Sequence, residues 1–343
     1  MNGGLVNSMN RRSWMLGSGA ALAASAVAQG EMADQTPQQQ RGAHWSVLDI
    51  RARLGISLTY FYYNYSHLAM LPRVQYSILE RVRAAGIPIV DIADYGDEKM
   101  YVPYTTKQPE TIRALAKQCR EVGLQISGMH STLGANPRPP LFNQLDIARK
   151  EIDLLLESGG HIWLTHLTAG NGVQNPENRK AIESLLKSYE NTNLVLTVEN
   201  TKAGQDVAEC VAFANAVDHP KFGVTIDIGH CVAPHKVEDR AKGMHPMCDP
   251  GGPTKIIQMA AKRLVHMHLH DFHRASTGWG DHHVPFLGNV RWVELFDALE
   301  EVNYRGTFLF ETTELYENTA VESVGAFPEM LQVVRDRQEL SKG

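Results

Sequence analysis

Short apolar runs alternate with helix-like stretches along most of this chain, and this alternation restricts the fold more than any other feature. The apolar runs occupy residues 55–63, 86–93, 123–130, 161–166, 193–200, 222–230, 264–271 and 306–314. Between them lie stretches such as 109–123, in which apolar residues recur three and four positions apart and a glycine marks the end. Strands that alternate with helices in this way form a parallel sheet, which is either open or closed into a barrel.

The number of strands favours a closed barrel. Eight strand–helix units match a (β/α)₈ TIM barrel, whose usual length of about 250 residues fits within a chain of 343. The competing fold is an open, doubly wound sheet, but no G-x-G-x-x-G motif follows the first predicted strand. We therefore predict an α/β protein with a single TIM barrel domain over residues 54–338.

Residue types that bind metal ions end six consecutive predicted strands, from the third to the eighth. They are His130, His166, Glu199, Asp227 with His230, His268 to Asp271, and Glu311. The active site of such a barrel is built at the carboxyl ends of its strands, so these side chains should converge at one mouth. A buried carboxylate without a partner costs several kcal/mol, and converging acids and imidazoles therefore imply a cation among them. The loop after the seventh strand adds Asp281 and His283.

The stretch VHMHLHDFH, residues 265–273, contains four histidines. Side chains alternate between the two faces of a strand, so His266, His268 and His270 should project from the same face. Imidazole is the commonest metal ligand and also the commonest general acid or base. This face of the seventh strand is therefore expected to serve the mouth of the barrel.

The N-terminal segment predicts export. Arg11-Arg12 precedes an apolar run that ends in Ala26-Val27-Ala28, a small-x-small cleavage pattern. The run is too short to span a bilayer comfortably, and the paired arginines are typical of a twin-arginine signal. We predict an export signal peptide of this type over residues 1–28 and a polar linker over 29–53. The mature protein would be periplasmic or otherwise exported, and would meet a membrane only during export.

The composition is that of a globular enzyme and argues against a nucleic-acid partner. The formal net charge is −5 and the sequence pI is about 6.3, whereas a surface that follows a phosphate backbone is basic. The four cysteines lie far apart without a C-x-x-C pair, so neither a disulfide framework nor a thiolate zinc site is indicated. A metal site in this chain would therefore use oxygen and nitrogen ligands.

Five motifs carry a resemblance to a known superfamily. They are VEN at 198–200, DIGH at 227–230, HLHD at 268–271, DHHVPFLG at 281–288 and ETTE at 311–314. Over residues 54–334 the chain resembles the xylose-isomerase-like TIM barrels, which include divalent-metal sugar isomerases and epimerases together with endonuclease IV. Similarity to the isomerases implies a catalytic metal held by Glu199, Asp227, His268 and Glu311. Similarity to the endonuclease implies additional zinc ligands at His130, His166, His230, Asp281 and His283.

We expect a metal-dependent isomerase or epimerase that acts on a small carbohydrate, a sugar or a related polyhydroxy carbonyl compound. A divalent ion such as Mn²⁺, Zn²⁺, Mg²⁺ or Fe²⁺ would stabilise an enediolate. Glu199 and Glu311 would transfer the proton as an acid–base pair, and His230 would bind a substrate hydroxyl. The remaining candidate substrate contacts are His270 and the rings of Tyr60 and Tyr95.

Two other enzyme classes use the same residues. A multinuclear zinc phosphodiester hydrolase that resembles endonuclease IV would use the larger ligand set to activate water. A metal-dependent lyase on an oxidised glycoside would remove a proton next to a ketone. A non-catalytic metal- or sugar-binding protein is a further alternative. The acidic charge and the export signal favour a small substrate, because duplex binding commonly rests on about 6 to 10 phosphate contacts from Lys and Arg.

Export is tested by replacing both arginines of the signal. The double variant Arg11→Lys, Arg12→Lys should stay inside the cell with its N-terminus intact, because the paired arginines direct twin-arginine export. Cell fractionation and N-terminal sequencing should find the parent protein outside the cytoplasm, beginning near Gln29. Unprocessed parent protein in the cytosol of its native host would contradict the prediction.

Overall fold

Most of the chain after its first 43 residues is described by the computed structural model. The described residues are 44–58, 71–94, 109–136, 138–201, 206–232, 252–272, 282–312 and 319–342. Residues 44–343 form one compact unit, which begins within the range that the sequence assigned to a linker. The predicted signal peptide lies outside the described residues. No helix in the described part of the chain is long and apolar enough to cross a membrane.

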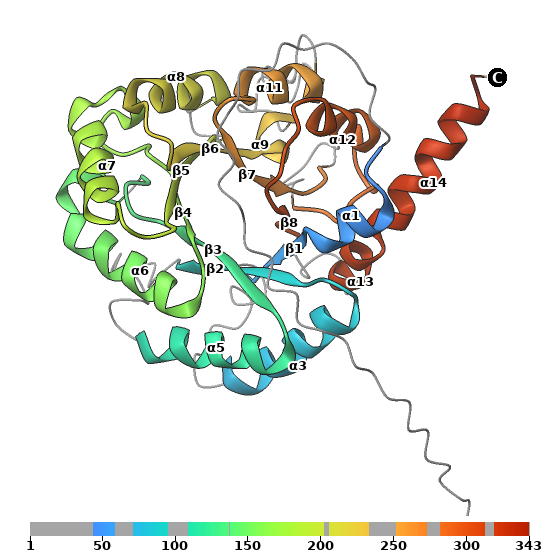
Figure 1. The fold of residues 1–343 in the computed structure, drawn as a ribbon, viewed down its shortest axis with the longest axis horizontal. Helices are drawn as coiled ribbons and strands as arrows, with labels where there is room; N and C mark the ends of the chain where they lie inside the picture. Colours follow the sequence, from blue (N-terminus) through green and yellow to red (C-terminus); the bar gives the residue numbers. More distant parts are fainter. Residues whose placement is uncertain are drawn as a thin grey trace, which may run out of the picture. The chain divides into compact units, whose positions relative to one another are not determined.

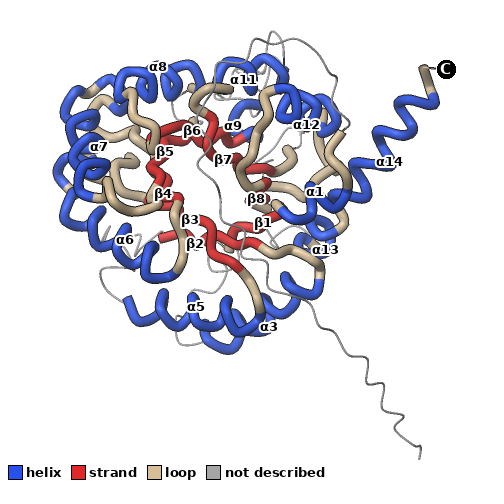
Figure 2. The backbone as a smooth tube through the Cα atoms, in the orientation of Figure 1, coloured by secondary structure: helices blue, strands red, loops and turns tan. Residues whose placement is uncertain are grey.

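Eight parallel strands close into a barrel, which confirms the predicted α/β fold. The strands are β1 (Leu54–Ser57), β2 (Ile89–Asp94), β3 (Gln125–Ser131), β4 (Ile162–Thr165), β5 (Val195–Glu199), β6 (Phe222–Asp227), β7 (Leu264–Leu269) and β8 (Phe308–Phe310). Each strand pairs with the next in sequence, and β8 pairs with β1 to complete the ring. The strands form the inner ring of Figure 1, and helices surround them in Figure 2.

The described helices follow the strands in sequence, apart from α1, which precedes β1. They are α1 (Val47–Ala52), α3 (Leu71–Ala84), α5 (Pro109–Val122), α6 (Leu145–Ser158), α7 (Pro176–Ser188), α8 (Val207–Val217), α9 (Ile228–Val232), α11 (Gly252–Ala260), α12 (Trp292–Glu301), α13 (Ala320–Gly325) and α14 (Phe327–Leu340), with 3-10 turns η2 (Leu141–Asn143) and η3 (Gly172–Gln174). The short α1 lies in the predicted linker. It begins there because Ser46 and Asp49 form a reciprocal capping box, with backbone N–H groups donating at 2.9 and 3.2 Å.

Apolar faces of the outer helices pack against the barrel. In α5 the buried residues Ile112, Leu115 and Cys119 recur at the three- and four-residue spacing of one helix face. Phe296 of α12 is fully buried, with its ring centroid 4.8 Å from that of Phe308 in β8 and 5.0 Å from that of Phe327 in α14. This aromatic cluster joins the last strand to the C-terminal helices.

The sixth predicted strand, 222–230, ends three residues early in the structure. The carboxylate of Asp227 accepts a hydrogen bond from the backbone N–H of His230 at 2.8 Å, and this contact starts the helical turn of α9. His230 therefore lies on a helix and not on a strand. The seventh strand likewise ends at Leu269, two residues before the predicted end.

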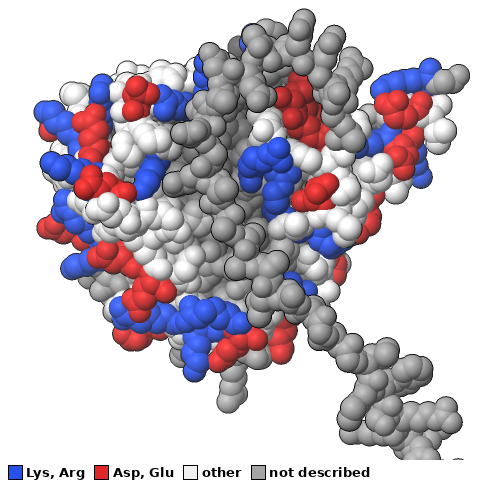
Figure 3. Space-filling model, in the orientation of Figure 1, with Lys and Arg blue, Asp and Glu red and all other residues white. Residues whose placement is uncertain are grey.

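Charged side chains of both signs are interspersed over the outer helices on the face drawn in Figure 3. Arg113 of α5 bonds to a carboxylate of Glu157 in α6 at 2.7 Å. On α7, Arg179 pairs with Glu183 and Lys180 with Glu177, both at 2.7 Å. Exposed pairs of this kind contribute little stability, so the apolar packing underneath carries the fold.

Truncating the aromatic cluster should destabilise the barrel measurably. Phe296→Ala is expected to lower the free energy of unfolding by about 3–5 kcal/mol, because it leaves a cavity among Phe308 and Phe327. Leu340→Ala is the control, since Leu340 is 82% exposed and such changes usually stay within about 0.5 kcal/mol. Denaturant titration followed by circular dichroism measures both, and equal effects would contradict this account of the packing.

Candidate active site

Four ligand-type side chains from four successive strands meet at the carboxyl end of the barrel. Glu199 ends β5, Asp227 ends β6, His268 lies in β7, and Glu311 directly follows β8. One ligand atom from each lies within 4.8 Å of the other three, and all four side chains are buried. The resemblance implied a metal site at these four residues. We call the three acids together with His268 the carboxylate group.

Imidazoles pair with two of these carboxylates. The Oε2 atom of Glu199 lies 2.7 Å from Nε2 of His166, and its Oε1 atom lies 3.0 Å from Nδ1 of His268. Glu311 Oε1 lies 3.2 Å from Nδ1 of His130. The structure thus brings His130 and His166, the additional ligands implied from β3 and β4, into direct contact with the carboxylate group.

The close contacts shift the pKa values of the buried groups. Burial would raise the pKa of Glu199, but the positive charges of His268 and His166 hold it well below the usual range. Glu311 is likewise buried, yet His268 and the hydrogen bond from His130 lower its pKa to about 2. Burial would lower the pKa of His268, but the charges of Glu311 and Glu199 raise it well above its ordinary value. Without a cation, ionised carboxylates therefore surround a protonated imidazole.

Asp227 is held by Asn200 through its backbone and by His270 through its carboxylate. The side-chain amide of Asn200 accepts from the Asp227 backbone N–H at 2.9 Å and donates to its backbone carbonyl at 3.0 Å. The Asp227 carboxylate lies 2.9 Å from Nε2 of His270. Burial would raise the pKa of Asp227, but the charges of His230 and His270 lower it well below its usual range. The carboxylate is therefore held ionised in a fixed position.

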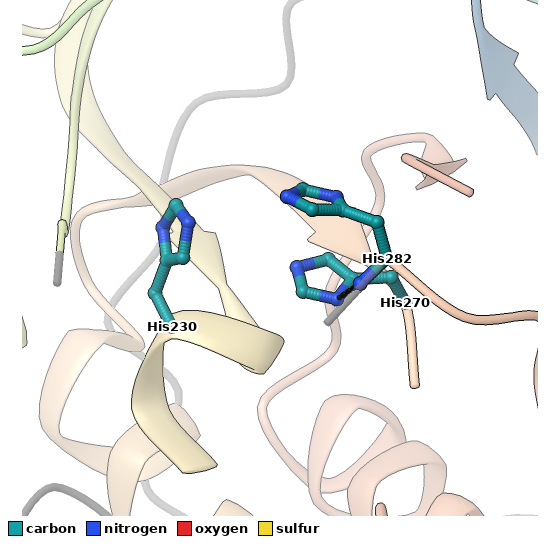
Figure 4. A group of neighbouring side chains, drawn as sticks. All are labelled: His230, His270 and His282. Carbon is teal, nitrogen blue, oxygen red and sulfur yellow. Dashed lines mark hydrogen bonds between the residues drawn. The ribbon is translucent and has the colours of Figure 1, made fainter. Parts of the chain in front are cut away.

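A second group consists of three imidazoles (Figure 4), one of which, His270, contacts Asp227 of the first group. His230 comes from α9, His270 follows β7, and His282 lies in the loop that leads to α12. One ring nitrogen from each lies within 4.8 Å of the others. The rings of His270 and His282 stack at 4.0 Å with an interplanar angle of 24°. We call these residues the imidazole group.

His282 was missed by sequence reasoning, which assigned the neighbouring His283. The backbone of His283 bridges to Asp271 in both directions, at 2.9 and 3.1 Å, and its side chain is in none of the ligand groups that the described residues form. His282 adopts a left-handed backbone conformation with φ 60°, which a strand-like i, i+2 spacing does not anticipate. The only sequence signal was the adjacent pair of histidines.

Asp91 is a second site residue that the sequence analysis missed. It lies in β2, is buried, and its Oδ1 atom has no hydrogen-bond partner. Its Oδ2 atom lies 4.0 Å from Nε2 of His268, which also lacks a partner. Burial raises the pKa of Asp91 to about 6. The sequence signal for Asp91 was its position as a single acidic residue inside the apolar run GIPIVDIA, residues 86–93.

The remaining candidates have different surroundings. His266 is buried one step below His268, with ring centroids 5.3 Å apart. The Asp271 carboxylate accepts from the backbone of Phe272 and from the indole of Trp292, at 2.8 and 3.0 Å, so it organises the loop after β7. The predicted site residues Tyr60, Tyr95 and Asp281 lie outside the described residues.

A family model described as xylose isomerase-like TIM barrel matches residues 79–335 of this chain. A 3-oxo-isoapionate decarboxylase from Pectobacterium atrosepticum is 22% identical over 227 residues, which cover 66% of this chain and 71% of that protein. An uncharacterized protein from Methanocaldococcus jannaschii is 25% identical over 122 residues, and this match spans only 35% of its length and 35% of this chain.

Solved structures share the fold at low identity. A 3-keto-D-glucoside 4-epimerase from E. coli superimposes with a TM-score of 0.57 at 14% identity, over 81% of this chain and 99% of that one. A xylose isomerase-like TIM barrel protein from Mycobacterium smegmatis, in complex with magnesium, gives a TM-score of 0.53 at 22% identity, over 76% of this chain and 87% of that one. At these identities the likeness shows the fold alone.

Binding of a divalent cation to the carboxylate group should release a proton. His268 is protonated below its raised pKa, and a metal ligand must be neutral, so cation affinity should rise with pH by up to about tenfold per unit for each proton released. Titration calorimetry with Mn²⁺ in two buffers of different ionisation enthalpy counts the protons. Affinity that is independent of pH, with no proton release, would contradict this assignment of charge.

Proposed function

Because this chain belongs to the xylose isomerase-like TIM barrel family, we propose that it is a divalent-metal-dependent isomerase or epimerase of a sugar-like carbonyl compound. The observation that carries the proposal is a pair of buried glutamates, Glu199 and Glu311. Glu199 ends β5 and Glu311 follows β8, two strands that are not neighbours in the ring. A carboxylate oxygen of each nevertheless lies within 4.8 Å of that of the other. An epimerase needs an acid and a base at one carbon. Two such carboxylates can supply both.

The carboxylate group fits a divalent cation. Three buried carboxylates and one imidazole are an oxygen-rich donor set, which suits Mg²⁺, Mn²⁺, Fe²⁺ or Zn²⁺. The unpartnered Nε2 atom of His268 faces the carboxylate of Asp91, as expected for a ligand histidine whose other nitrogen is turned toward an acid. Glu199, Asp227, His268 and Glu311 would hold the ion. When bound, it would polarise the substrate carbonyl as a Lewis acid.

The proton transfer itself falls to the two glutamates. Their lowered pKa values keep both ionised near neutral pH, so either one can accept a proton from the carbon next to the carbonyl. The hydrogen bonds from His166 and His130 hold each carboxylate in one orientation. When the other glutamate has taken up a proton from solvent, its return to the opposite face would invert the carbon, and return of the abstracted proton to an adjacent carbon would isomerise the substrate.

The names of similar proteins support the proposed substrate class. The names of the Pectobacterium and E. coli relatives describe substrates with an oxo or keto group on a sugar-like skeleton. A carbonyl of this kind acidifies the neighbouring C–H bond, which is what the two glutamates require. We extend this class to the present chain, and propose that the enzyme is exported and acts on a small keto-sugar or aldose outside the cytoplasm. His230 and His270 are suited to bind its hydroxyl groups.

Two further activities remain as second candidates. The contacts of His130 and His166 with the carboxylate group favour a multinuclear hydrolase, because they enlarge the set of metal ligands. A lyase on an oxidised glycoside would use the same first proton abstraction, and the decarboxylase relative acts as a lyase by its name. The products formed from one substrate distinguish these candidates from an epimerase.

Solvent-exchange kinetics should separate the roles of the two glutamates. Glu199→Gln and Glu311→Gln should each lower epimerisation by about 10²–10⁴-fold, the usual contribution of a general acid or base. In deuterated water, each variant should still exchange the proton of one epimer, because the other glutamate remains a base. Proton NMR of a panel of keto-sugars measures exchange and conversion together.

A matched control is Glu183→Gln, which removes an exposed carboxylate of α7 that pairs only on the surface with Arg179. It should leave conversion unchanged. Full activity in both Glu199→Gln and Glu311→Gln would end the acid–base proposal. Nicking of abasic duplex DNA by protein that carries about three zinc ions, without conversion of any sugar, would favour the hydrolase instead.

A further inference from the structure

We propose that Asp91 is a positioning residue, whose carboxylate fixes the ring of His268 so that Nδ1 is presented to the carboxylate group. This role rests on the cation site proposed above and adds to it an acid from another strand. Asp91 lies in β2 and His268 in β7, two strands that are not neighbours in the ring. Both side chains are buried, and Oδ2 of Asp91 lies 4.0 Å from Nε2 of His268. The two groups therefore meet inside the barrel.

The two ring nitrogens of His268 have different surroundings. Nδ1 lies 3.0 Å from Oε1 of Glu199 and 3.6 Å from Oε2 of Glu311, so it faces the carboxylate group. Nε2 has no hydrogen-bond partner and faces Asp91. A neutral imidazole carries its proton on one nitrogen and its lone pair on the other. A cation held among the glutamate oxygens can be bound by this ring only at Nδ1, so the remaining proton must be on Nε2.

Asp91 directs a negative charge toward that proton. Among the described residues, the only ion pair of Asp91 is with His268. Ser57, its partner in register on β1, bonds to the carboxylate through its side chain, while Oδ1 has no partner. At 4.0 Å the attraction between Asp91 and the ring is electrostatic, and it is strong because a buried pair is poorly screened. It favours the tautomer with its proton on Nε2.

The position of Asp91 fits an indirect role and not that of a further cation ligand. It belongs to none of the ligand groups that the described residues form. The ring of His268 lies between it and Glu199, with one nitrogen turned toward each acid. Histidines that bind metals usually donate their other ring N–H to a carboxylate or carbonyl, which fixes the tautomer and the ring orientation. Asp91 is the acid that β2 supplies for this purpose.

Calorimetric titration of the full chain with Mn²⁺ tests the role. Asp91→Asn removes the charge, keeps the size of the side chain, and should weaken Mn²⁺ binding by about 10–100-fold. The matched control Glu151→Gln neutralises an equally buried acid of α6, whose carboxylate accepts from the Trp163 indole at 3.0 Å. The control should bind Mn²⁺ as tightly as the parent, because α6 belongs to the outer layer. Circular dichroism reports whether each variant is folded.

NMR of Mg²⁺-loaded protein with isotope-labelled histidines separates positioning from a general effect on the fold. In the parent, the Nε2–H of His268 should resonate downfield and exchange slowly with water, because the proton is buried and faces a carboxylate. In Asp91→Asn the same resonance should move upfield, whereas in Glu151→Gln it should stay in place. The resonance is assigned by its disappearance in His268→Gln.

The positioning role is wrong if Asp91→Asn binds Mn²⁺ with the affinity of the parent, or if Glu151→Gln loses as much. It is also wrong if the Nε2–H resonance is the same in Asp91→Asn, or if Nε2 carries no proton in the Mg²⁺-loaded parent, a result that needs no variant. Each of these outcomes leaves the proposed cation site and the roles of the two glutamates standing. Parent protein that binds no Mn²⁺ would instead overturn the cation site, and this role with it.

Discussion

Three buried carboxylates converge at one end of this barrel, and their mutual repulsion is the constraint on which the surrounding structure depends. Glu199, Asp227 and Glu311 cannot share a dry space as bare charges, because burial alone opposes ionisation of each. The nearby glutamates raise the pKa values of His130 in β3 and His268 in β7, so these imidazoles supply compensating protons. A divalent ion bound by the same carboxylates would replace those protons.

Closure of the sheet makes this convergence possible. Neighbouring parallel strands end at the same edge, and the pairing of β8 with β1 turns that edge into a ring. Glu199 and Glu311 are more than one hundred positions apart in sequence, yet a carboxylate oxygen of one lies within 4.8 Å of a carboxylate oxygen of the other. Below them, the hydroxyl groups of Thr197 and Thr225 bond at 2.8 Å, so the barrel interior is packed directly under the site.

Periodicity was enough to predict the barrel, because its pattern repeats in every β/α unit, whereas the family was expected from the resemblance of five short motifs. They were insufficient where a single residue leaves the pattern. Asp227 ends its strand early by capping the turn to His230. His282, which has a positive φ, lies with His230 and His270, whereas the resemblance had implied its neighbour His283 as an additional ligand. Asp91 was missed because a strand interior that reads as apolar gives no sign that one acid faces a distant histidine.

The backbone bridge between Asp271 and His283 fixes the position of the histidine beside it. Asp271 and His283 exchange two backbone hydrogen bonds, at 2.9 and 3.1 Å, and Nδ1 of His282 lies 2.8 Å from the carbonyl oxygen of Glu311. Because the bridge uses only backbone atoms, the side chain at position 283 can change without moving His282, provided that the new residue keeps its N–H.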